Sequence, residues 1–370
     1  MKKVLYGTTA LIAAGMFASA AEAATPIKMT IGGYLNSYMG WTSAELKNAG
    51  DATLNNRFDV MTDAQIAFTG ATTLDNGIKV GAVVEVKATT FGEDNNWIDD
   101  VYATVDSKYG RAIIGAADNV AVMQHVSAPD AGVLGVEETK FIYWGVNPGV
   151  VLDATYADLD GNAQKISYIS PKMAGFSFGL SWVPGAEAKA PFADGNGYKN
   201  QSVVRNGADF RSAYVLSGAY NGKFKNVELD ASVAYANYDA IGGSNVEDYN
   251  AGVSVGVAGF TVGGAYRNVD MAETGQKDSK AYDFGVGYEN GPYAVSASYF
   301  VSQNGKKDGV KGNKLEMYQV SGKYKLGAGV DAFATFAYLD SNLKKDNAAI
   351  VAGTTDKDAW TVVTGLALTF

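Results

Sequence analysis

The 370-residue chain contains no cysteine, only seven prolines and a single histidine, His125. Without cysteine, a disulfide framework, thiolate catalysis and cysteine-ligated metals are excluded. The chain also lacks a His-Glu-x-x-His sequence, and its Gly-x-Ser-x-Gly sequence at residues 252–256 lies within a predicted strand rather than at a strand-to-helix turn. It therefore offers little for hydrolytic chemistry. A formal net charge of −9 argues against a nucleic-acid partner. We therefore expect a protein that is not an enzyme and carries no cofactor.

Long apolar runs are missing as well. Beyond the N-terminus, no segment has the roughly 18 consecutive apolar residues of a transmembrane helix. The N-terminus itself has two lysines, an apolar run at 4–18 and a small-x-small sequence at 21–23, which is the pattern of a secretory signal peptide. We predict that residues 1–23 are a signal peptide and that residues 24–370 form one exported domain. If this domain enters a membrane, it must do so as strands.

Apart from Val363 and Thr364, the end of the chain alternates between apolar and polar or small residues. Such period-2 alternation indicates a β-strand with one apolar face. A terminal aromatic residue on such a strand is typical of outer-membrane β-barrels, in which aromatic rings lie at the membrane interface. We therefore predict that Phe370 is an assembly signal on the closing strand, whereas an ordinary strand of a soluble β-sandwich is the alternative. The residues of the apolar face are Trp360, Val362, Leu366, Leu368 and Phe370.

Similar segments recur along the chain, and the connections between them are short and long in turn. The short connections carry turn sequences such as Asp75-Asn76-Gly77 and Asn290-Gly291. Short turns on one side and long loops on the other are typical of bacterial outer-membrane barrels. We therefore predict an all-β fold, a 16-stranded antiparallel transmembrane β-barrel. Its predicted strands are 27–41, 58–74, 78–90, 99–107, 111–117, 164–170, 176–183, 211–221, 227–238, 249–257, 260–268, 281–289, 292–302, 315–326, 330–339 and 359–370.

Charged and apolar residues occupy opposite faces of the predicted strands. A basic residue that faced lipid at the membrane midplane would cost about 2–4 kcal/mol. The charged face should therefore line a water-filled lumen. The predicted basic residues of the pore wall are Arg57, Lys79, Lys87 and Arg111, with Lys165 and Arg267 as two further candidates.

The longest connection, residues 118–163, has no strong repeat pattern. A connection of this length is often functional, and we interpret it as a constriction loop that folds back into the pore. Its acids Asp118, Asp130, Glu137 and Glu138 could narrow the pore, anchor the loop or bind a calcium ion. The alternative is that residues 150–156 add a strand pair, which would give an 18-stranded channel.

Three stretches resemble one family. They are Ile31-Gly32-Gly33-Tyr34, the segment Ile166-Ser167-Tyr168-Ile169-Ser170-Pro171-Lys172-Met173-Ala174-Gly175-Phe176-Ser177-Phe178-Gly179, and the terminal Phe370. In these stretches and in its strand count, the chain resembles the Gram-negative general porins, most closely those of alphaproteobacteria. The resemblance implies a homotrimer in the outer membrane whose inward-folded third loop maps onto residues 118–163. It also implies contacts with outer-membrane lipid, lipopolysaccharide and the barrel assembly machinery.

In such a pore, ions and small hydrophilic solutes would diffuse passively between loop carboxylates and basic wall residues. The excess of negative charge leads us to expect a modest preference for cations. A substrate-selective channel for sugars or an oligoanion, and a structural surface protein or adhesin, are the alternatives.

Overall fold

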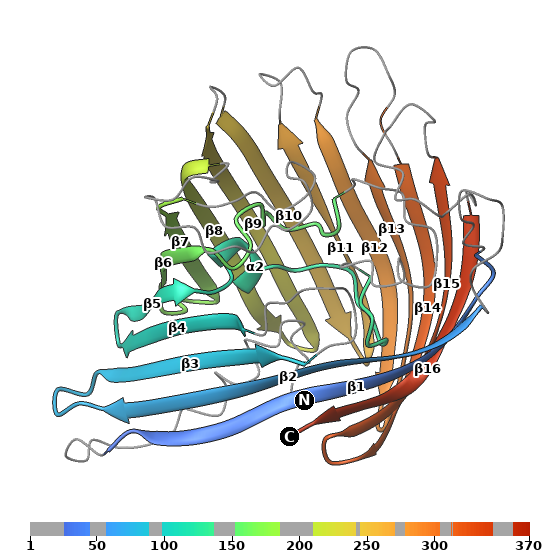
Figure 1. The fold of residues 1–370 in the computed structure, drawn as a ribbon, viewed down its shortest axis with the longest axis horizontal. Helices are drawn as coiled ribbons and strands as arrows, with labels where there is room; N and C mark the ends of the chain where they lie inside the picture. Colours follow the sequence, from blue (N-terminus) through green and yellow to red (C-terminus); the bar gives the residue numbers. More distant parts are fainter. Residues whose placement is uncertain are drawn as a thin grey trace.

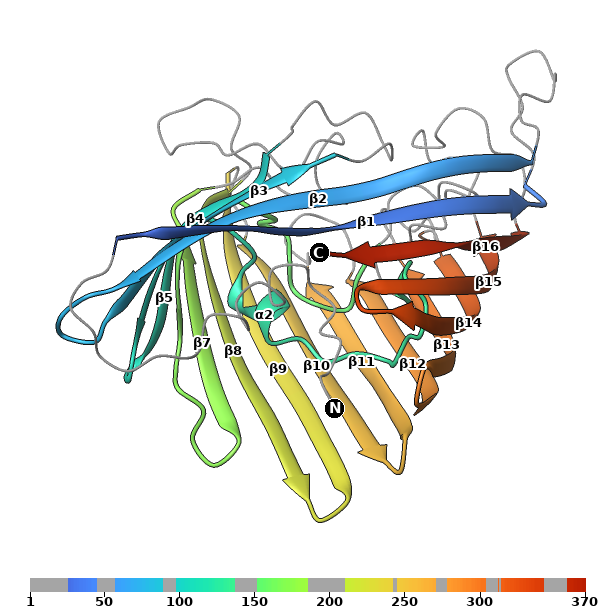
Figure 2. The same cartoon turned by 90° about the horizontal axis from the view of Figure 1, so that it is seen from below.

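The computed structural model describes residues 26–44, 57–88, 98–136, 152–185, 210–241, 245–270, 278–303, 312, 314–342 and 358–370. These residues form sixteen strands in one closed antiparallel barrel, in which each strand pairs with its neighbours in sequence and β1 pairs with β16 (Figures 1 and 2). None of the helices within the described ranges is long and apolar enough to cross a membrane.

The strands confirm the predicted architecture. Their largest displacement is at β10, which begins at Asn245 rather than at residue 249. The first eight strands are β1 (Lys28–Thr42), β2 (Phe58–Thr73), β3 (Lys79–Lys87), β4 (Ile98–Ser107), β5 (Gly110–Ala116), β6 (Gln164–Ile169), β7 (Phe176–Val183) and β8 (Phe210–Phe224). The second eight are β9 (Val227–Ala240), β10 (Asn245–Val257), β11 (Phe260–Asp270), β12 (Ser279–Asn290), β13 (Tyr293–Gln303), β14 (Lys314–Gly327), β15 (Val330–Asn342) and β16 (Asp358–Thr369).

The 18-stranded alternative is wrong. β5 pairs directly with β6, from Arg111↔Ile169 to Ala116↔Gln164, and the described residues 152–156 are not in a strand. The described residues of the connection between these two strands therefore add no strand pair to the barrel.

The end of the chain closes the barrel. The register of β1 and β16 runs without a break from Tyr34↔Thr369 to Thr42↔Thr361. Beyond it, the Gly33 N–H donates to the Phe370 carbonyl oxygen at 2.9 Å, and the Phe370 N–H donates to the Gly33 oxygen at 3.1 Å. The closed ladder leaves no strand edge exposed to lipid, which a membrane-spanning sheet requires.

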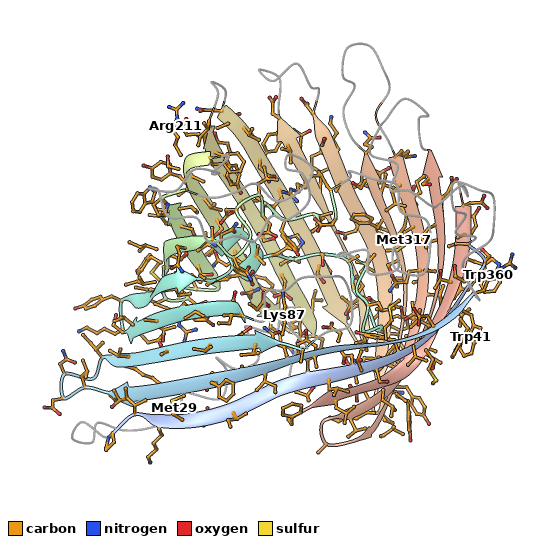
Figure 3. All side chains as sticks on the ribbon, viewed as in Figure 1. Met29, Trp41, Lys87, Arg211, Met317 and Trp360 are labelled. Atoms are coloured by element: carbon orange, nitrogen blue, oxygen red, sulfur yellow. The ribbon has the colours of Figure 1, made fainter. Side chains whose placement is uncertain are left out.

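The outer face is apolar and carries aromatic side chains near both ends of the strands. Met29, Trp41 and Trp360 point away from the barrel in Figure 3. At the short-turn end, ring pairs include Phe260–Tyr288 at 4.5 Å and Tyr293–Tyr324 at 4.9 Å between centroids. At the long-loop end they include Trp41–Phe58 at 4.8 Å and Tyr299–Tyr318 at 4.7 Å. The band between the two sets of rings has the composition of a lipid-facing surface.

The inner face is less polar than the sequence analysis predicts. Inward-facing Phe300, Leu315, Met317 and Leu339 are fully buried and belong to the same hydrophobic cluster as Val120, Leu134, Leu152 and Leu159 of the β5–β6 connection. Figures 1 and 2 show the short helix α2 (Val120–Met123) and the segments around it inside the ring of strands. The connection thus supplies apolar partners within the barrel, where alternation alone predicts water.

Candidate functional site

The β5–β6 connection has an outgoing limb, described from residue 117 to 136, and a returning limb, described from residue 152 to 163. Asn119 joins these two limbs. Its Oδ1 accepts hydrogen bonds from the N–H groups of Ala121 (2.8 Å) and Val122 (3.2 Å), so that Asn119 caps α2. Its Nδ2 donates to the Ala157 oxygen at 3.0 Å and to Asp160 Oδ1 at 2.7 Å. A single buried amide therefore fixes the outgoing limb to the returning limb.

Backbone N–H groups of the connection donate to polar side chains of the inner wall. These bonds satisfy donors that would otherwise be buried without an acceptor. The acceptors lie on β7, β9, β10, β12 and β13, so the connection follows a large part of the wall. The bonds are Val120 N to Ser181 Oγ (3.1 Å), Val126 N to Ser232 Oγ (3.0 Å), Ala128 N to Asp283 Oδ1 (2.7 Å), Ala131 N to Ser296 Oγ (2.8 Å), Ala157 N to Asn250 Oδ1 (3.1 Å) and Leu159 N to the Tyr238 hydroxyl (3.2 Å).

Two buried ion pairs hold the returning limb. The Lys165 ammonium lies 3.2 Å from Asp160 Oδ2, and it also donates to the carbonyl oxygens of Ala117 and Gly161. The Arg267 guanidinium lies 2.7 Å from Asp248 Oδ2 and donates to the Ala154 oxygen at 3.4 Å. Lys165 and Arg267 are therefore on the inner face, as predicted, but they are buried and bind the connection.

Asp130 binds the opposite wall. Its Oδ1 accepts from the Gly132 N–H at 2.7 Å and from Ser296 Oγ at 3.2 Å, while its Oδ2 accepts from Gln319 Nε2 at 3.0 Å. Burial raises the pKa of the Asp130 carboxyl, and these hydrogen bonds, with another from Ser321, partly offset the rise. Of the roles considered for the loop acids, this placement favours anchoring.

A β-bulge gathers carboxylates where the connection begins. The β3–β4 register shifts between Val84↔Val101 and Val86↔Ile98, so that the consecutive residues Asp99 and Asp100 both lie opposite Glu85. We call Glu85, Asp99, Asp100 and Asp118 the acidic cluster. Its members are within electrostatic range of one another.

The acidic cluster is held by amides and by one lysine. Gln65 Nε2 donates to Glu85 and, at 3.1 Å, to Asp99 Oδ2. Asn162 Nδ2 donates to Asp99 Oδ1 at 2.9 Å, so the returning limb also contacts the cluster. The Lys87 ammonium lies 2.6 Å from Asp99 Oδ1.

The four predicted basic wall residues do not meet at one level. Lys87 contacts the acidic cluster, whereas Lys79 is at the other end of β3, about 27 Å along the strand at ~3.4 Å per residue. There Lys79 and Arg111 flank Asp106 in register, and Arg111 Nε lies 2.5 Å from Asp106 Oδ1. Arg57 is exposed and precedes β2 at the long-loop end. A single ladder of bases opposite the loop is therefore not formed by these residues.

Of the four predicted loop acids, Asp118 belongs to the acidic cluster and Asp130 to the far wall, while Glu137 and Glu138 lie outside the described residues. Glu85, Asp99 and Asp100 are not among the site residues predicted from the sequence. Glu85 has the parity of the charged face, which could have pointed to it, but the bulge that aligns Asp99 with Asp100 has no comparable signal. In the described ranges, no group of three or more acidic or histidine side chains is arranged to hold a metal ion.

A family model described as Gram-negative porin matches residues 7–344. The chain belongs to the Gram-negative porins. It is thus an outer-membrane channel for the passive diffusion of small solutes, and this membership does not favour the sugar- or oligoanion-selective alternative. A comparison with curated protein sequences gives no significant match.

Solved porin structures share the fold at low sequence identity. An anion-selective porin from Comamonas acidovorans is 13% identical, with a TM-score of 0.59, and the match covers 93% of this chain and 100% of that one. The trimer form of the outer-membrane protein OmpT from Vibrio cholerae is 11% identical, with a TM-score of 0.60 and coverages of 94% and 100%. OmpF of Salmonella typhi, in complex with daunomycin, is 14% identical, with a TM-score of 0.59 and coverages of 93% and 98%.

Proposed function

We propose that this porin passes ions and small hydrophilic solutes with a modest preference for cations, and that the acidic cluster sets this preference. The observation that carries the proposal is the pair of partly exposed carboxylates, Asp99 and Asp118, where the inward connection leaves the wall, next to the buried Glu85 and Asp100. Lys87 neutralises part of this charge through Asp99, and Lys165, which is in electrostatic range of Asp100, is paired with Asp160.

Distance limits which charges act on a passing ion. In physiological salt, the field of a charge exposed to water is largely screened beyond about 8 Å. Lys79 and Arg111 are near the short-turn end and share Asp106, so their field at the acidic cluster is weak. We propose that the carboxylates of Glu137 and Glu138 add to the negative charge that acts on a passing ion.

The test is the reversal potential in a tenfold KCl gradient across a planar bilayer. The wild-type channel should favour potassium, and the double variant Asp99→Asn/Asp118→Asn should lose most of this preference, because Asp99 and Asp118 are the partly exposed members of the acidic cluster whereas Glu85 and Asp100 are buried. Glu228→Gln on β9 is the matched control, because its carboxylate pairs with Lys223 near the short-turn end and its removal should leave selectivity unchanged. A wild-type channel that favours chloride, or a double variant identical to wild type, would refute the role of the cluster. Glu137→Gln/Glu138→Gln tests the contribution of the loop acids separately.

We also propose that the chain is a homotrimer whose subunits meet through the outer faces of β1–β5. Aliphatic residues dominate these faces, with Met29, Ile31, Leu35, Val101 and Ile114 all exposed in the single chain. Mass photometry in detergent should show trimers. Ile114→Asn should lower the trimer fraction, whereas Leu216→Asn on the outer face of β8 should not. Equal effects of the two changes would contradict this choice of interface.

The signal peptide remains part of the proposal, because residues 1–23 lie outside the described residues. The intact mass of protein isolated from outer membranes should correspond to a chain that begins at Ala24.

A further inference from the structure

The outgoing limb of the β5–β6 connection crosses the inner wall of the barrel within a few residues. Figures 1 and 2 show it running from α2 across β10, β11 and β12. Neighbouring strands lie about 4.8 Å apart, so the distance from β10 to β12 is roughly 10 Å, which about three residues of extended chain can span. Residues 126–129 make this crossing.

Each residue of the crossing lies against an inward-facing glycine. The four glycines, which we call the glycine track, are Gly252 of β10, Gly263 of β11, and Gly285 and Gly287 of β12. Gly263 and Gly285 are direct partners in the β11–β12 register. A Cβ atom added to the four glycines in turn would lie 1.7 Å from the Val126 oxygen, 3.0 Å from the Ser127 oxygen, 3.1 Å from Ala128 Cβ and 3.2 Å from Pro129 Cβ. The limb therefore lies closer to the wall than side chains beneath it would permit.

The lumen is on the other side of the limb. Val126 and Pro129 are partly exposed although they lie inside the ring of strands. Before and after the crossing, the N–H groups of Val120 and Ala131 donate to serines of the wall. These bonds hold the limb in place along the wall, so a side chain beneath the crossing would move it into the lumen.

We propose that the glycine track determines the size limit of the channel, because it keeps the limb flat on the wall and thereby sets the width that is left for solutes. Protein interiors are close-packed, so an added methyl group displaces its neighbour. At Gly252 this neighbour is the Val126 carbonyl group, which would have to retreat from 1.7 Å to at least 3.0 Å. The inference rests on the channel function and is independent of the cation preference.

Gly252→Ala is the decisive variant. Its single-channel conductance in planar bilayers should be lower than that of the wild type. In liposome-swelling measurements, the rate for a disaccharide relative to the rate for a pentose should fall several-fold, because a solute close to the channel width is hindered most by a small loss of width. Both readouts come from assembled channels, so a lower yield of folded protein does not produce them.

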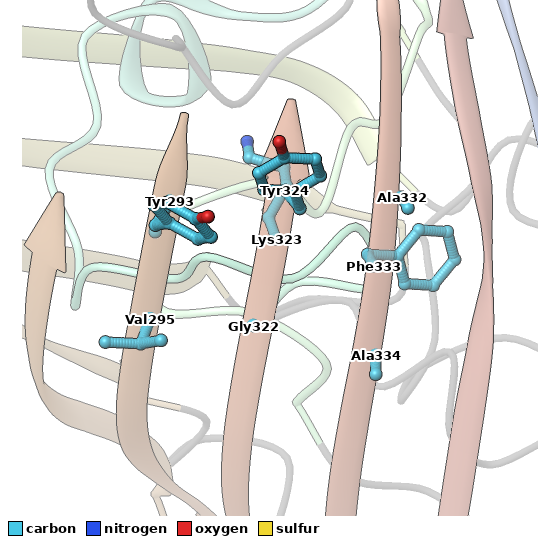
Figure 4. Close-up of a pocket in the computed structure, with 9 residues that line it drawn as sticks. Tyr293, Val295, Gly322, Lys323, Tyr324, Ala332, Phe333 and Ala334 are labelled. Atoms are coloured by element: carbon cyan, nitrogen blue, oxygen red, sulfur yellow. The ribbon is translucent and has the colours of Figure 1, made fainter. Parts of the chain in front are cut away.

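Two other glycines provide matched controls. Gly256 is also on the inner face of β10, but the atoms nearest to an added Cβ are at least 3.6 Å away. Gly322 is on the outer face of β14, where it borders a shallow hollow of about 390 Å³ over β13–β15 (Figure 4), and an added Cβ would meet no atom within 4 Å. Gly256→Ala and Gly322→Ala should keep the conductance and the swelling ratio of the wild type.

A second pair of variants tests the glycine track if Gly252→Ala does not assemble. Gly285→Val should lower the conductance and the swelling ratio, because its side chain meets Ala128 Cβ at 3.1 Å, whereas Gly256→Val should not. Wild-type values in the track variants that assemble, a higher conductance in either of them, or an equal decrease in the Gly256 variants would overturn the proposal. The reversal potential should remain that of the wild type in every variant, since the acidic cluster is centred on β3 and β4. A failure here therefore leaves the proposal for the cation preference standing.

Discussion

The protonation of Asp130 depends on its burial more than on contact with the pore. Burial desolvates this carboxyl and raises its pKa. The Asp130 carboxyl therefore holds a proton more tightly when the β5–β6 connection is docked on the barrel wall than when it is undocked. Acidification therefore favours docking, and docking weakens as the pH rises through the raised pKa. The effect begins at the ordinary aspartate pKa of about 4 and extends upward.

Hydrogen exchange of residues 126–134 should report this dependence. Protection in the wild-type protein should increase as the pH is lowered from neutral, after correction for intrinsic exchange, whereas Asp130→Asn should show a flat profile. Asp130→Ala should lose about 1–3 kcal/mol of docking free energy, because it leaves the Gly132 N–H and the Gln319 amide without their acceptor. Parallel profiles for wild type and Asp130→Asn would contradict the assignment.

The pair of Arg267 and Asp248 leads to a second prediction for single residues. Arg267→Met would leave the Asp248 carboxylate buried without its cation and should cost about 3–5 kcal/mol. The double variant Arg267→Met/Asp248→Leu removes both charges and should recover part of this loss. The temperature at which the folded band disappears on gels measures both. If the double variant is no more stable than Arg267→Met, the buried charge is not the cause.

Alternation of residue types predicts which face of a strand a side chain is on, and it does so for Lys165 and Arg267. It does not predict their burial, because Asp160 and Ala154, which cover them, are on a segment without alternation. Glu85 illustrates the same limit: its charge parity was visible, but its partners depend on a bulge in the neighbouring strand.

Among the elements, β16 is followed directly by Phe370, a residue that combines two functions. The backbone of Phe370 completes the ladder with Gly33, and its ring is exposed on the outside. Deletion of Phe370 should strongly reduce the yield of assembled barrel in the outer membrane, because both contributions are lost. Phe370→Ala keeps the two backbone hydrogen bonds, so its yield measures the ring alone. A wild-type yield from the deletion would show that neither contribution is needed.

Strands were predictable here because each has one apolar face over most of its length and ends at a turn sequence. The helix α2 was not, since four residues are too few to show a helical period. Asn119 carries a capping signal, but an asparagine before a short apolar stretch is equally compatible with a turn.

At the scale of the whole molecule, we expect the barrel to form without the β5–β6 connection, the internal segment that lies within it. Replacing residues 119–161 with a short glycine-containing turn would preserve the pairing of β5 with β6 and should leave a closed β-barrel by circular dichroism. Thermal stability should fall, because Lys165 loses Asp160, Arg267 loses the Ala154 oxygen and the inward apolar residues lose their partners. Single-channel conductance should rise. Unchanged conductance would show that the internal segment does not narrow the channel.

The internal segment also constrains the order of events during biogenesis. Its hydrogen-bond partners appear later in the chain: Tyr238 follows Leu159 by 79 residues, and Gln319 follows Asp130 by 189. Contacts of such sequence separation form slowly, since the intervening loop must close first. The docking of the segment is consequently not complete until β14 is in place, two strands before β16 seals the barrel against β1. Its docking therefore belongs to the last stage of maturation, and a translocation intermediate that carries only the first strands would expose Val120, Leu134 and Leu159 to chaperones.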